Sequence, residues 1–428
     1  MKQFSVIILG AGNRGLRYAN HMQEYPDRYR IVGVADPVEA RRRYFNRHFG
    51  VPLEACYEDW REALSRDKMA DIAVISTCDS MHYEAALIAI EKGYDLLLEK
   101  PVAQTAKECA EIAAAAKKKG VRVLVCHVLR YSPFYNRVKE IVMDGTLGEL
   151  VSLDQVEAIE GIHFGHSFVR GNWHKEADSA PMLLAKSCHD LDIIQWLLDR
   201  KCKKIASFGS LTHFTRENAP EGAPDRCADG TCPKMETCPY NCIRQYVENK
   251  TNSRRRIITR GISKNYDPTD EEVMQALRET DYGRCVYKMD NDVVDHQVVT
   301  MEFEGGVTAN FTVNAFNTGG RYVRIYGTRG ELYAHMKDNE ITLRLIGEKE
   351  PVTVPVSKTE ESIDGGHGGG DRGIIRELYD YMSGDYKGYR AADIETSVSN
   401  HLLCFAAEEA RHTSTVVSTC EFAARFEE

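Results

Sequence analysis

The sequence predicts an α/β protein, in which an N-terminal doubly wound parallel sheet precedes a larger α+β domain with a mostly antiparallel sheet. Strand-like and helix-like segments alternate with short links over residues 1–127, and such alternation is typical of a parallel sheet. Beyond about residue 130, strand-like runs follow one another, and glycine pairs separate several of them as in hairpins. We therefore expect two domains, 1–127 and 128–428, with a cysteine-rich insertion at about residues 216–283.

In the N-terminal domain, an apolar run predicts a first strand that ends in a glycine-rich turn, and a helix-like segment follows at residues 16–25. Later runs that stop at glycine or at charged residues predict further elements of the same two kinds. The expected strands are 4–9, 31–36, 72–77, 94–98 and 121–128, and the other expected helices are 39–49, 81–93 and 105–119.

In the C-terminal domain, period-two alternation predicts strands, and longer amphipathic runs predict helices on one side of the sheet. The expected strands are 149–160, 204–211, 293–303, 307–315, 322–327, 331–336 and 341–346, and the expected helices are 133–145, 182–198, 374–382 and 391–412.

Gly10, Gly12 and Gly15 have the spacing of a dinucleotide-binding turn between a strand and a helix. Gly10 permits a sharp exit from the strand, Gly12 lets a pyrophosphate approach the backbone, and Gly15 lets the helix pack closely. Asp36 ends the next strand, where its carboxylate would accept hydrogen bonds from ribose hydroxyls and repel a 2′-phosphate. This pattern predicts that NAD, rather than NADP, is the cofactor.

Charge and composition exclude several other classes of protein. The chain has 55 basic and 64 acidic residues and a net charge of −9, which argues against nucleic acid or an anionic membrane as its main partner. No run approaches the roughly 18 apolar residues of a membrane span, and we expect a cytoplasmic protein. Most of the 13 cysteines stand singly in apolar segments, as buried thiols do in a reducing compartment. Three arginines close to Asp36 are expected to line a solvated helix face: Arg41, Arg42 and Arg43.

Three predicted strands end in polar residues. Thr77 follows one, Glu99-Lys100-Pro101 follows the next, and His127 follows the third. Because ligands of doubly wound sheets bind at the carboxyl ends of the strands, we expect these residues to face the same crevice as the glycine turn.

The glycine turn, the Glu99-Lys100-Pro101 triplet and the helix around His189 together resemble the Gfo/Idh/MocA family, over perhaps three quarters of the chain. The resemblance implies a Rossmann domain, a second domain with a large open-faced sheet, and homo-oligomers formed through that sheet. It also implies an NAD(P)-dependent oxidoreductase that acts on sugars, cyclitols or related compounds.

The resemblance also implies roles for individual residues. Lys100 matches the lysine near the nicotinamide and the reacting hydroxyl, His189 the active-site histidine, and Asp192 the acid on the same helix. His82 and Glu99 match residues of the cofactor side. Catalysis is thus assigned to Lys100, His189 and Lys186, and the cofactor-binding residues are expected to be Gly10, Gly12, Asn13, Arg14, Gly15, Asp36, Thr77, His82, Glu99, Lys100 and His127.

One departure from the family is at Ala185, where members often carry an aspartate four residues before the histidine. Lys186 stands next to it, and on one continuous helix it would share a face with His189. The departure makes a branch that acts on glycosides a closer likeness, and the segment His367-Gly-Gly-Gly-Asp371 also resembles that branch. The expected substrate-binding residues are Tyr131, His163, Asp192 and His367.

Three functions remain open at this point. The first is an NAD-dependent oxidoreductase of a small-molecule carbohydrate hydroxyl, in which His189 moves the proton and Lys100 stabilises the alkoxide. The second is an NAD-retaining redox glycosidase that oxidises C3, eliminates the aglycone and re-reduces the sugar. Its additional base would be Tyr131, His163 or His166. The third is a non-catalytic sugar or nucleotide sensor.

The insertion contains a cluster of cysteines with the spacing C-x4-C-x5-C-x3-C, namely Cys227, Cys232, Cys238 and Cys242. Four thiols this close could hold Zn²⁺, but the spacing is not that of paired C-x2-C knuckles. Both zinc and free thiols are compatible with it, and no metal is assigned from the sequence.

Overall fold

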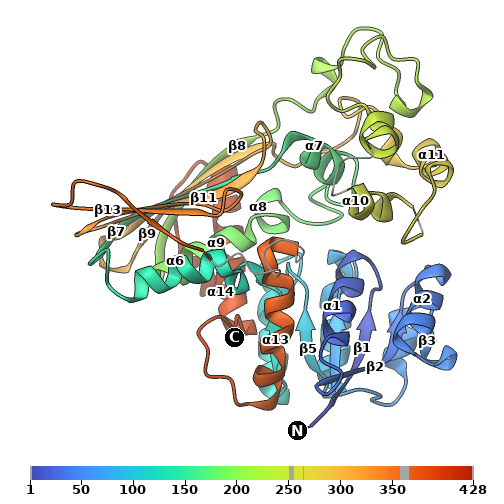
Figure 1. Cartoon of the computed structure of the whole chain (residues 1–428), viewed down its shortest axis with the longest axis horizontal. Coiled ribbons are helices and arrows are strands. Elements are labelled where there is room, and N and C mark those ends of the chain that lie inside the picture. Colours follow the sequence, from blue (N-terminus) through green and yellow to red (C-terminus); the bar gives the residue numbers. More distant parts are fainter. Residues whose placement is uncertain (1, 250–254, 264, 357–365, 427–428) are drawn as a thin grey trace.

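The computed structural model describes residues 2–249, 255–263, 265–356 and 366–426. It confirms the predicted fold class, with a parallel N-terminal sheet and a larger, mostly antiparallel second sheet. Figure 1 shows the two sheets with the insertion above the N-terminal domain.

The N-terminal sheet has six parallel strands in the order β3-β2-β1-β4-β5-β6. The strand order reverses direction between β1 and β4, and in such sheets ligands bind at the carboxyl ends of the strands on either side of this point. The strands are β1 (Phe4–Leu9), β2 (Tyr29–Ala35), β3 (Cys56–Tyr57), β4 (Ile72–Ile75), β5 (Asp95–Leu98) and β6 (Val123–Val125).

Apolar clusters cover both faces of this sheet. Successive side chains of β1 point to opposite faces, and each set packs in its own cluster. Val6 and Ile8 lie in one apolar cluster, and Ile7 and Leu9 lie in another. Residues of α1 (Asn13–Gln23), α2 (Glu39–Phe49) and α13 (Gly370–Ser383) complete the first cluster, and those of α3 (Trp60–Ser65), α4 (His82–Glu91) and α5 (Ala106–Lys119) complete the second. The short helices of this domain are η1 (Leu53–Ala55) and η2 (Asp79–Met81).

The C-terminal part of the chain returns to the N-terminal sheet. Ile374, Ile375 and Leu378 of α13 pack in the same cluster as Val6 and Ile8. Helix α14 (Ile394–Thr413) packs against α5 and also against the second sheet. Figure 1 shows α13 beside α1, although they are far apart in sequence. The two sheets are therefore joined by helices from the end of the chain.

The second sheet has nine strands in the order β14-β13-β12-β11-β7-β10-β9-β8-β15. Strands β7 and β10 are parallel, and the other neighbours are antiparallel. The strands are β7 (Leu150–Ala158), β8 (Cys202–Ser210), β9 (His296–Phe303), β10 (Thr308–Asn314), β11 (Gly320–Gly327), β12 (Gly330–His335), β13 (Glu340–Leu345), β14 (Val352–Val354) and β15 (Val417–Ser418).

The two faces of the second sheet differ in burial. One face packs against helices α6 (Pro133–Met143), α9 (Cys188–Leu198) and α14 (Figure 1). On the other face, alternate side chains stay exposed, among them Phe208 (70% exposed) and Val298 (40%). Other helices of this domain are η3 (Val128–Tyr131), α7 (Gly161–Phe164), η4 (Gly165–Val169), α8 (Met182–Ala185), η9 (Glu304–Gly306), η10 (Gly366–Gly369) and α15 (Thr419–Ala423).

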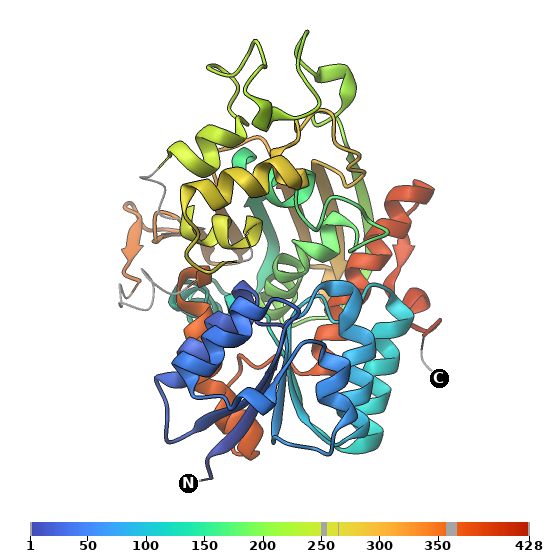
Figure 2. The ribbon, with the colours of Figure 1, turned by 90° about the vertical axis from the view of Figure 1, so that its right-hand side faces the viewer.

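The insertion has mostly short helices. Both views show it over the carboxyl ends of the N-terminal strands (Figures 1 and 2). Its elements are η5 (Arg216–Asn218), η6 (Cys227–Asp229), η7 (Arg244–Glu248), α10 (Arg255–Ile262), α11 (Asp270–Glu279) and η8 (Asp281–Gly283). None of the helices in the described ranges is long and apolar enough to cross a membrane.

One predicted helix was wrong in an informative way. The sequence predicts a single helix over residues 182–198, but the structure divides it into α8 and α9, with Lys186 and Ser187 between them. Ser187 has φ −100° and ψ 6°, outside the α-helical region. Lys186 and His189 are therefore not on one continuous helical face.

Candidate active site

The glycine turn has the geometry that its sequence predicts. Gly10 has φ +92°, and a Cβ there would lie 2.5 Å from the carbonyl oxygen of Ser76. A Cβ on Gly15 would lie 2.1 Å from the carbonyl oxygen of Gly10. A Cβ on Gly12, in contrast, would meet nothing within 4 Å. The first and third glycines are thus required by the protein's own packing, whereas the second leaves open space.

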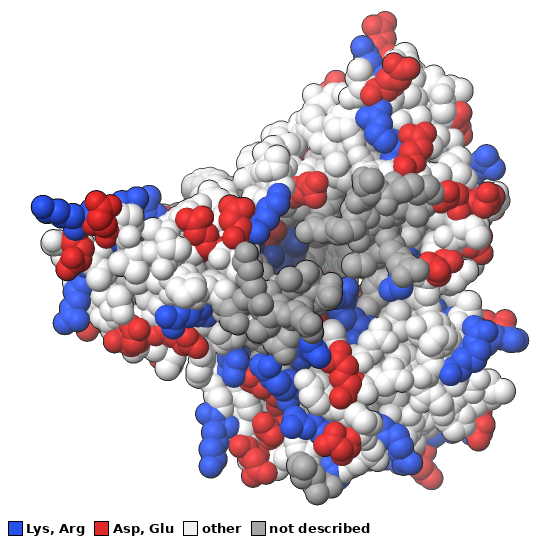
Figure 3. Space-filling model, in the orientation of Figure 1, with Lys and Arg blue, Asp and Glu red and all other residues white. Residues whose placement is uncertain are grey.

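The open space at Gly12 fits a dinucleotide. Gly12 precedes the first turn of α1, no side chain caps that helix end, and the first turn has no acidic residue. Free N–H groups at a helix N-terminus bind phosphate. The buried hydroxyl of Thr77 also has no hydrogen-bond partner among the described residues. Figure 3 shows a recess between the N-terminal domain and the insertion, with basic side chains at its wall.

Asp36 is 4% exposed and ties the glycine turn to the end of β2. Its Oδ2 accepts a hydrogen bond from Ala11 N at 2.9 Å, and its Oδ1 accepts one from Val38 N at 2.9 Å. Two of the three arginines beside it contact Asp36 instead of lining the solvated helix face that the sequence predicts. Arg41 lies 3.4 Å from Asp36 Oδ2, and Arg42 donates to the Asp36 carbonyl at 2.6 Å.

Only the third of these arginines behaves as the sequence predicts. Arg43 is exposed and pairs with Glu39 along the outer face of α2. The other two are drawn towards Asp36 because its carboxylate and carbonyl offer acceptors at the start of the same helix.

Arg14 and Glu99 form a partly buried ion pair instead of standing free for the cofactor. Arg14 also donates to Tyr18, and to Asp371 Oδ1 at 2.9 Å. Glu99 accepts a further hydrogen bond from the Tyr18 hydroxyl at 2.5 Å. Burial opposes ionisation of Glu99, but Arg14 and Lys100 outweigh it and lower the pKa of Glu99. This network fixes the base of Lys100 against α1.

His82 joins two strand-end loops. Its Nδ1 lies 2.7 Å from the carbonyl oxygen of Pro101, and its Nε2 lies 3.3 Å from that of Thr77. The ring is 1% exposed. His82 therefore positions the loops that carry Lys100 and Thr77, and contributes no exposed face of its own.

The ammonium group of Lys100 is held at the break between α8 and α9. Lys100 Nζ donates to the carbonyl oxygen of Ala185 at 2.8 Å. Ala185 stands where family members often carry an aspartate. At this position the chain offers a main-chain oxygen to the lysine in place of a carboxylate.

His189, on the first turn of α9, lies among other histidines and close to Lys100. Its ring centroid is 5.9 Å from that of His127 and 5.6 Å from that of His367. The ring is 4% exposed, and its Nδ1 has no hydrogen-bond partner in the described part of the chain. Burial lowers the pKa of His189 well below its usual value, with Lys100 and His367 adding to the effect. The imidazole is therefore uncharged at neutral pH.

Lys186 points into a buried cluster of charges on the inner face of the second sheet. Its Nζ lies 3.8 Å from Glu157 Oε1, and Glu157 also pairs with Arg321. Arg321 Nε donates to Asp190 Oδ1 at 2.9 Å. Burial lowers the pKa of Lys186 and raises that of Glu157. Two cations thus balance two carboxylates beside His189.

Asp192 and His127 lie one layer deeper. Asp192 is 1% exposed, and both of its oxygens accept hydrogen bonds from Arg130, at 2.8 and 2.6 Å. His127 Nδ1 lies 3.6 Å from Asp192 Oδ2, and its ring packs edge-on against His401. The structure places His127 beside His189 and Asp192 on the same helix as His189, and both predicted residues have little exposed surface.

His367 completes the ring of polar groups. It has φ +55°, and the next two glycines, Gly368 and Gly369, also have positive φ. The imidazole lies next to His189. Its Nδ1 lies 3.1 Å from Asp371 Oδ1. Burial opposes ionisation of Asp371, but Arg14 and His367 hold the pKa of that carboxyl well below its usual range. His367 is 33% exposed, so it has contact with solvent.

The remaining predicted residues lie elsewhere. Tyr131 is 2% exposed and lines a pocket of about 260 Å³ with Arg376 and Arg390. His163 lies half-buried in α7. His166 stacks on Tyr282 of the insertion, and burial, followed by Arg170, lowers the pKa of His166 to about 4.

Sequence reasoning missed three groups in this site. Arg321 and Glu157 occupy inward positions of two strands, and His401 of α14 accepts a hydrogen bond from Val102 N at 3.0 Å. A charged residue at an inward position of an alternating strand was the only signal available for the first two. Nothing local marked His401, because its partner is 299 positions away.

The comparisons decide the family. The model of the Gfo/Idh/MocA oxidoreductase family with NAD-binding Rossmann fold matches residues 4–127, and that of its C-terminal alpha/beta domain matches residues 139–419. The chain belongs to the Gfo/Idh/MocA family. This Gfo/Idh/MocA protein therefore has an NAD-binding Rossmann domain, as its sequence predicts.

The proteins to which this chain is similar are named for different enzyme activities. It is 23% identical to the putative oxidoreductase YteT of Bacillus subtilis, over 84% of each chain. It is 26% identical to inositol 2-dehydrogenase/D-chiro-inositol 3-dehydrogenase of Lactiplantibacillus plantarum, over 47% of this chain and 54% of that protein. It is 22% identical to 2,7-anhydro-N-acetylneuraminate hydratase of Escherichia coli, over 48% of this chain and 53% of that protein.

Solved structures show the same fold at low sequence identity. An oxidoreductase of Agrobacterium radiobacter, solved with NAD+, L-tartaric acid and magnesium, gives a TM-score of 0.69 at 12% identity, over 98% of this chain and 99% of that one. An NAD-binding oxidoreductase of Klebsiella pneumoniae gives 0.69 at 17% identity, over 98% and 99%.

Proposed function

We propose that this protein is an NAD-dependent oxidoreductase that transfers hydride between a carbohydrate CH–OH group and the nicotinamide. The observation that carries the proposal is that a buried, uncharged His189 lies close enough to Lys100 for the ammonium group to lower its pKa, while Ala185 O holds that ammonium group at the carboxyl edge of the Rossmann sheet. A proton acceptor and a cation at the same point are what oxidation of an alcohol needs.

The residues present fit the cofactor. NAD would bind through its pyrophosphate to Gly12 and the first turn of α1, through its ribose to Asp36, and on its nicotinamide side to Thr77. When bound, NAD supplies the hydride acceptor. The protein must then orient the alcohol, remove its proton and exclude water.

His189 is suited to remove the proton, because burial keeps it in the basic form at neutral pH. Lys100 stabilises the oxyanion that develops as the proton leaves. Ala185 O fixes the direction of the ammonium through the 2.8 Å hydrogen bond. General acid–base catalysis typically contributes about 10²- to 10⁴-fold to the rate.

A polyhydroxylated substrate suits the rest of the lining. Lys186, Glu157, Arg321 and His367 offer donors and acceptors around His189. Together with Asp190, the charges of this set largely cancel. Neutral, hydroxyl-rich molecules match such a mixed set better than strongly charged ones. The named inositol dehydrogenases act on compounds of this kind.

The proposal is tested by incubating the protein with NAD and a panel of cyclitols, free sugars and glycosides while NADH is recorded. We expect NADH formation with at least one compound, and a loss of about 10²- to 10⁴-fold in kcat for His189→Asn. NAD binding by that variant should stay within a few-fold of the unchanged protein. The control is His174→Asn, because His174 hydrogen-bonds Gly171 in a loop outside this group of residues. An active His189→Asn protein would contradict the assignment.

A second candidate, an NAD-retaining redox glycosidase or lyase, is favoured by two observations. One relative is a hydratase of an anhydro sugar. His367, paired with Asp371 and partly exposed, is a second acid–base group beside His189. Such an enzyme would oxidise the sugar at C3, eliminate the aglycone and re-reduce the ring. Release of the aglycone with no net NADH, and with solvent deuterium incorporated next to C3, would establish this activity over the first.

A further inference from the structure

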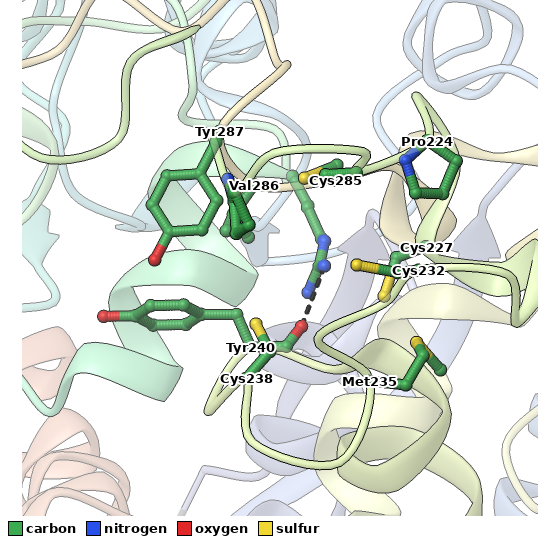
Figure 4. Close-up of a pocket in the computed structure, with 12 residues that line it drawn as sticks. Pro224, Cys227, Cys232, Met235, Cys238, Tyr240, Cys285, Val286 and Tyr287 are labelled. Atoms are coloured by element: carbon green, nitrogen blue, oxygen red, sulfur yellow. Dashed lines mark hydrogen bonds between the residues drawn. The ribbon is translucent and has the colours of Figure 1, made fainter. Parts of the chain in front are cut away.

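The cysteines of the insertion surround a common cavity. Cys227, Cys232 and Cys238 of the predicted cluster line it, and Cys285, from beyond the insertion, is the fourth thiol (Figure 4). Cys242 lies behind Cys227, whose sulfur accepts a hydrogen bond from Cys242 N at 3.5 Å. The four lining cysteines therefore differ from the four that sequence spacing alone grouped together.

Main-chain contacts bring these thiols together from three segments. Cys285 N donates to the carbonyl oxygen of Asp225 at 2.9 Å, which places Cys285 beside the segment that carries Cys227. The turn between Cys232 and Cys238 is closed by hydrogen bonds from Met235 N to Cys232 O at 3.1 Å and from Cys238 N to Lys234 O at 2.8 Å.

The cavity itself is small and lined by soft donors. Its volume is about 20 Å³, which is room for one water-sized particle. Besides the four cysteines, Met235, Arg170, two tyrosines and several apolar residues line it, and no carboxylate or histidine does. Thiolate is the ligand that zinc prefers in structural sites, which are tetrahedral with four protein ligands.

Arg170 supplies a second observation that calls for an anion. Arg170 is 4% exposed, and its guanidinium donates hydrogen bonds to the carbonyl oxygens of Arg284 at 2.8 Å and Tyr240 at 2.9 Å. A buried cation costs free energy unless negative charge lies close to it. A Zn²⁺ ion bound by four thiolates is a net anion and would provide that charge.

The surrounding subdomain also lacks a large core. Among its described residues, the buried apolar cluster has seven members, two of which are Cys227 and Cys242. Small units of this size usually need a metal or disulfides in addition to hydrophobic burial.

We propose that Cys227, Cys232, Cys238 and Cys285 form a structural tetrathiolate site for a single Zn²⁺ ion. In the described ranges, no three such side chains already stand close enough together to hold an ion, so the thiols must reorient to bind one. The site closes when the thiols turn inward about their Cα–Cβ bonds, to sulfur–zinc distances of about 2.3 Å. Each thiol releases its proton as it binds, so no oxidant or reductant is involved.

The site would stabilise the part of the protein that lies over the cofactor. Tyr266 of the insertion donates a hydrogen bond to the carbonyl oxygen of Ala11 in the glycine turn. His166, four residues before Arg170, packs on Tyr282 and Tyr246. Removing the ion should therefore weaken NAD binding as well as lower the stability of the insertion.

The test is the metal content of the full-length protein after growth with added zinc and extensive dialysis. We expect about one zinc per chain in the unchanged protein, and at least about a fivefold loss of bound zinc in Cys238→Ser and in Cys285→Ser, since each removes a ligand. The control is Cys420→Ser, because Cys420 is exposed and distant in sequence from the cluster. That variant should keep its zinc.

A second measurement covers the case in which the variants fail to fold. In the unchanged protein, an organomercurial should release zinc to a chromogenic chelator in step with thiol modification, and Co²⁺ substitution should give the absorption of a tetrahedral thiolate complex. Absence of zinc from the unchanged protein would overturn the proposal. So would iron–sulfur absorption, a Cys227–Cys242 disulfide in its place, or zinc that persists in both ligand variants.

Discussion

His189 is an uncharged side chain surrounded by charged ones. Lys100, Lys186 and Arg321 are cations close by, and Glu157 and Asp190 balance two of them. Burial is the largest cause of the lowered pKa of His189, and the cations add to it. At the scale of single residues, the site therefore depends on a histidine whose surroundings keep its imidazole uncharged and able to accept a proton.

The glycine turn permits a sharp test of what each glycine does. Gly12 has φ −70°, which alanine tolerates, and a Cβ there would meet no protein atom within 4 Å. Gly12→Ala should therefore leave the thermal unfolding temperature within about 2 °C of the unchanged protein, while weakening NAD binding by at least tenfold or about 1.4 kcal/mol.

The matched variant is Gly15→Ala, whose Cβ would lie 2.1 Å from Gly10 O. It should lower the unfolding temperature by several degrees, on the scale of about 1–3 kcal/mol for overpacking. Calorimetry of binding and thermal scans measure both. Normal NAD binding by the Gly12→Ala variant would show that the pyrophosphate does not bind at this turn.

Asp36 should determine which dinucleotide binds. Its carboxylate repels a 2′-phosphate, and Arg41 already lies 3.4 Å from it. In Asp36→Ser the repulsion is lost while Arg41 remains, so we expect the ratio of NAD to NADP affinity to fall by at least about tenfold, or 1.4 kcal/mol. Arg43→Ser, on the exposed side of the same helix, is the control. An unchanged ratio would show that another residue discriminates between the 2′-hydroxyl of NAD and the 2′-phosphate of NADP.

At the scale of secondary-structure elements, the end of β5 is held from three directions. His82 of α4 contacts Pro101, Lys100 reaches the break between α8 and α9, and His401 of α14 accepts a hydrogen bond from Val102. The sequence predicted this strand and the loop that follows it, because strand, turn and helix signals are local. The role of Lys100 in that loop stays a prediction.

The sequence could not predict the helix break or the contacts made at it. Residues 182–198 contain no glycine or proline, and their apolar residues recur at helical spacing, so periodicity favours one helix. The break exists next to Lys100, which is 85 positions away from Ala185. Contacts over such distances depend on tertiary packing, which local pattern does not contain.

His401 should make stability depend on pH. Burial, followed by His127, lowers the pKa of His401 to about 3. Unfolded histidine titrates near 6.5, so between these values the unfolded chain binds more protons and stability falls as pH falls. From pH 7.5 to 5.5 this group alone should cost about 1.4 kcal/mol.

Urea unfolding at the two pH values measures this effect by comparison with His401→Gln. The unchanged protein should lose more stability on acidification than the variant does, by about 1.4 kcal/mol. Equal losses in the two proteins would show that His401 is not the group responsible.

At the scale of the whole molecule, the uncovered face of the second sheet is the surface on which we expect copies of the chain to associate. Phe208 and Val298 are paired across β8 and β9 on this face, 70% and 40% exposed. Exposed apolar patches of this kind on a sheet mark association sites. The predicted homo-oligomer therefore remains a prediction, now with named residues.

Light scattering tests this prediction. Phe208→Glu with Val298→Glu should convert the oligomer to a smaller species with unchanged NAD binding, because two buried charges are costly at an interface. Leu53→Glu is the control, since Leu53 is 67% exposed on the N-terminal domain. A particle mass that stays the same in the double variant, or is monomeric in the unchanged protein, would contradict the prediction.

The return of α13 to the N-terminal sheet has a consequence for how the protein is made. Val6 and Ile8 emerge from the ribosome early, but α13, one of the helices that complete their apolar cluster, begins only at Gly370. Because domains generally fold as they are synthesised, the nascent nucleotide-binding unit must wait with one side only partly covered until translation is nearly finished. Chaperones that hold apolar surfaces should therefore associate with stalled chains that lack this helix far more than with released full-length protein.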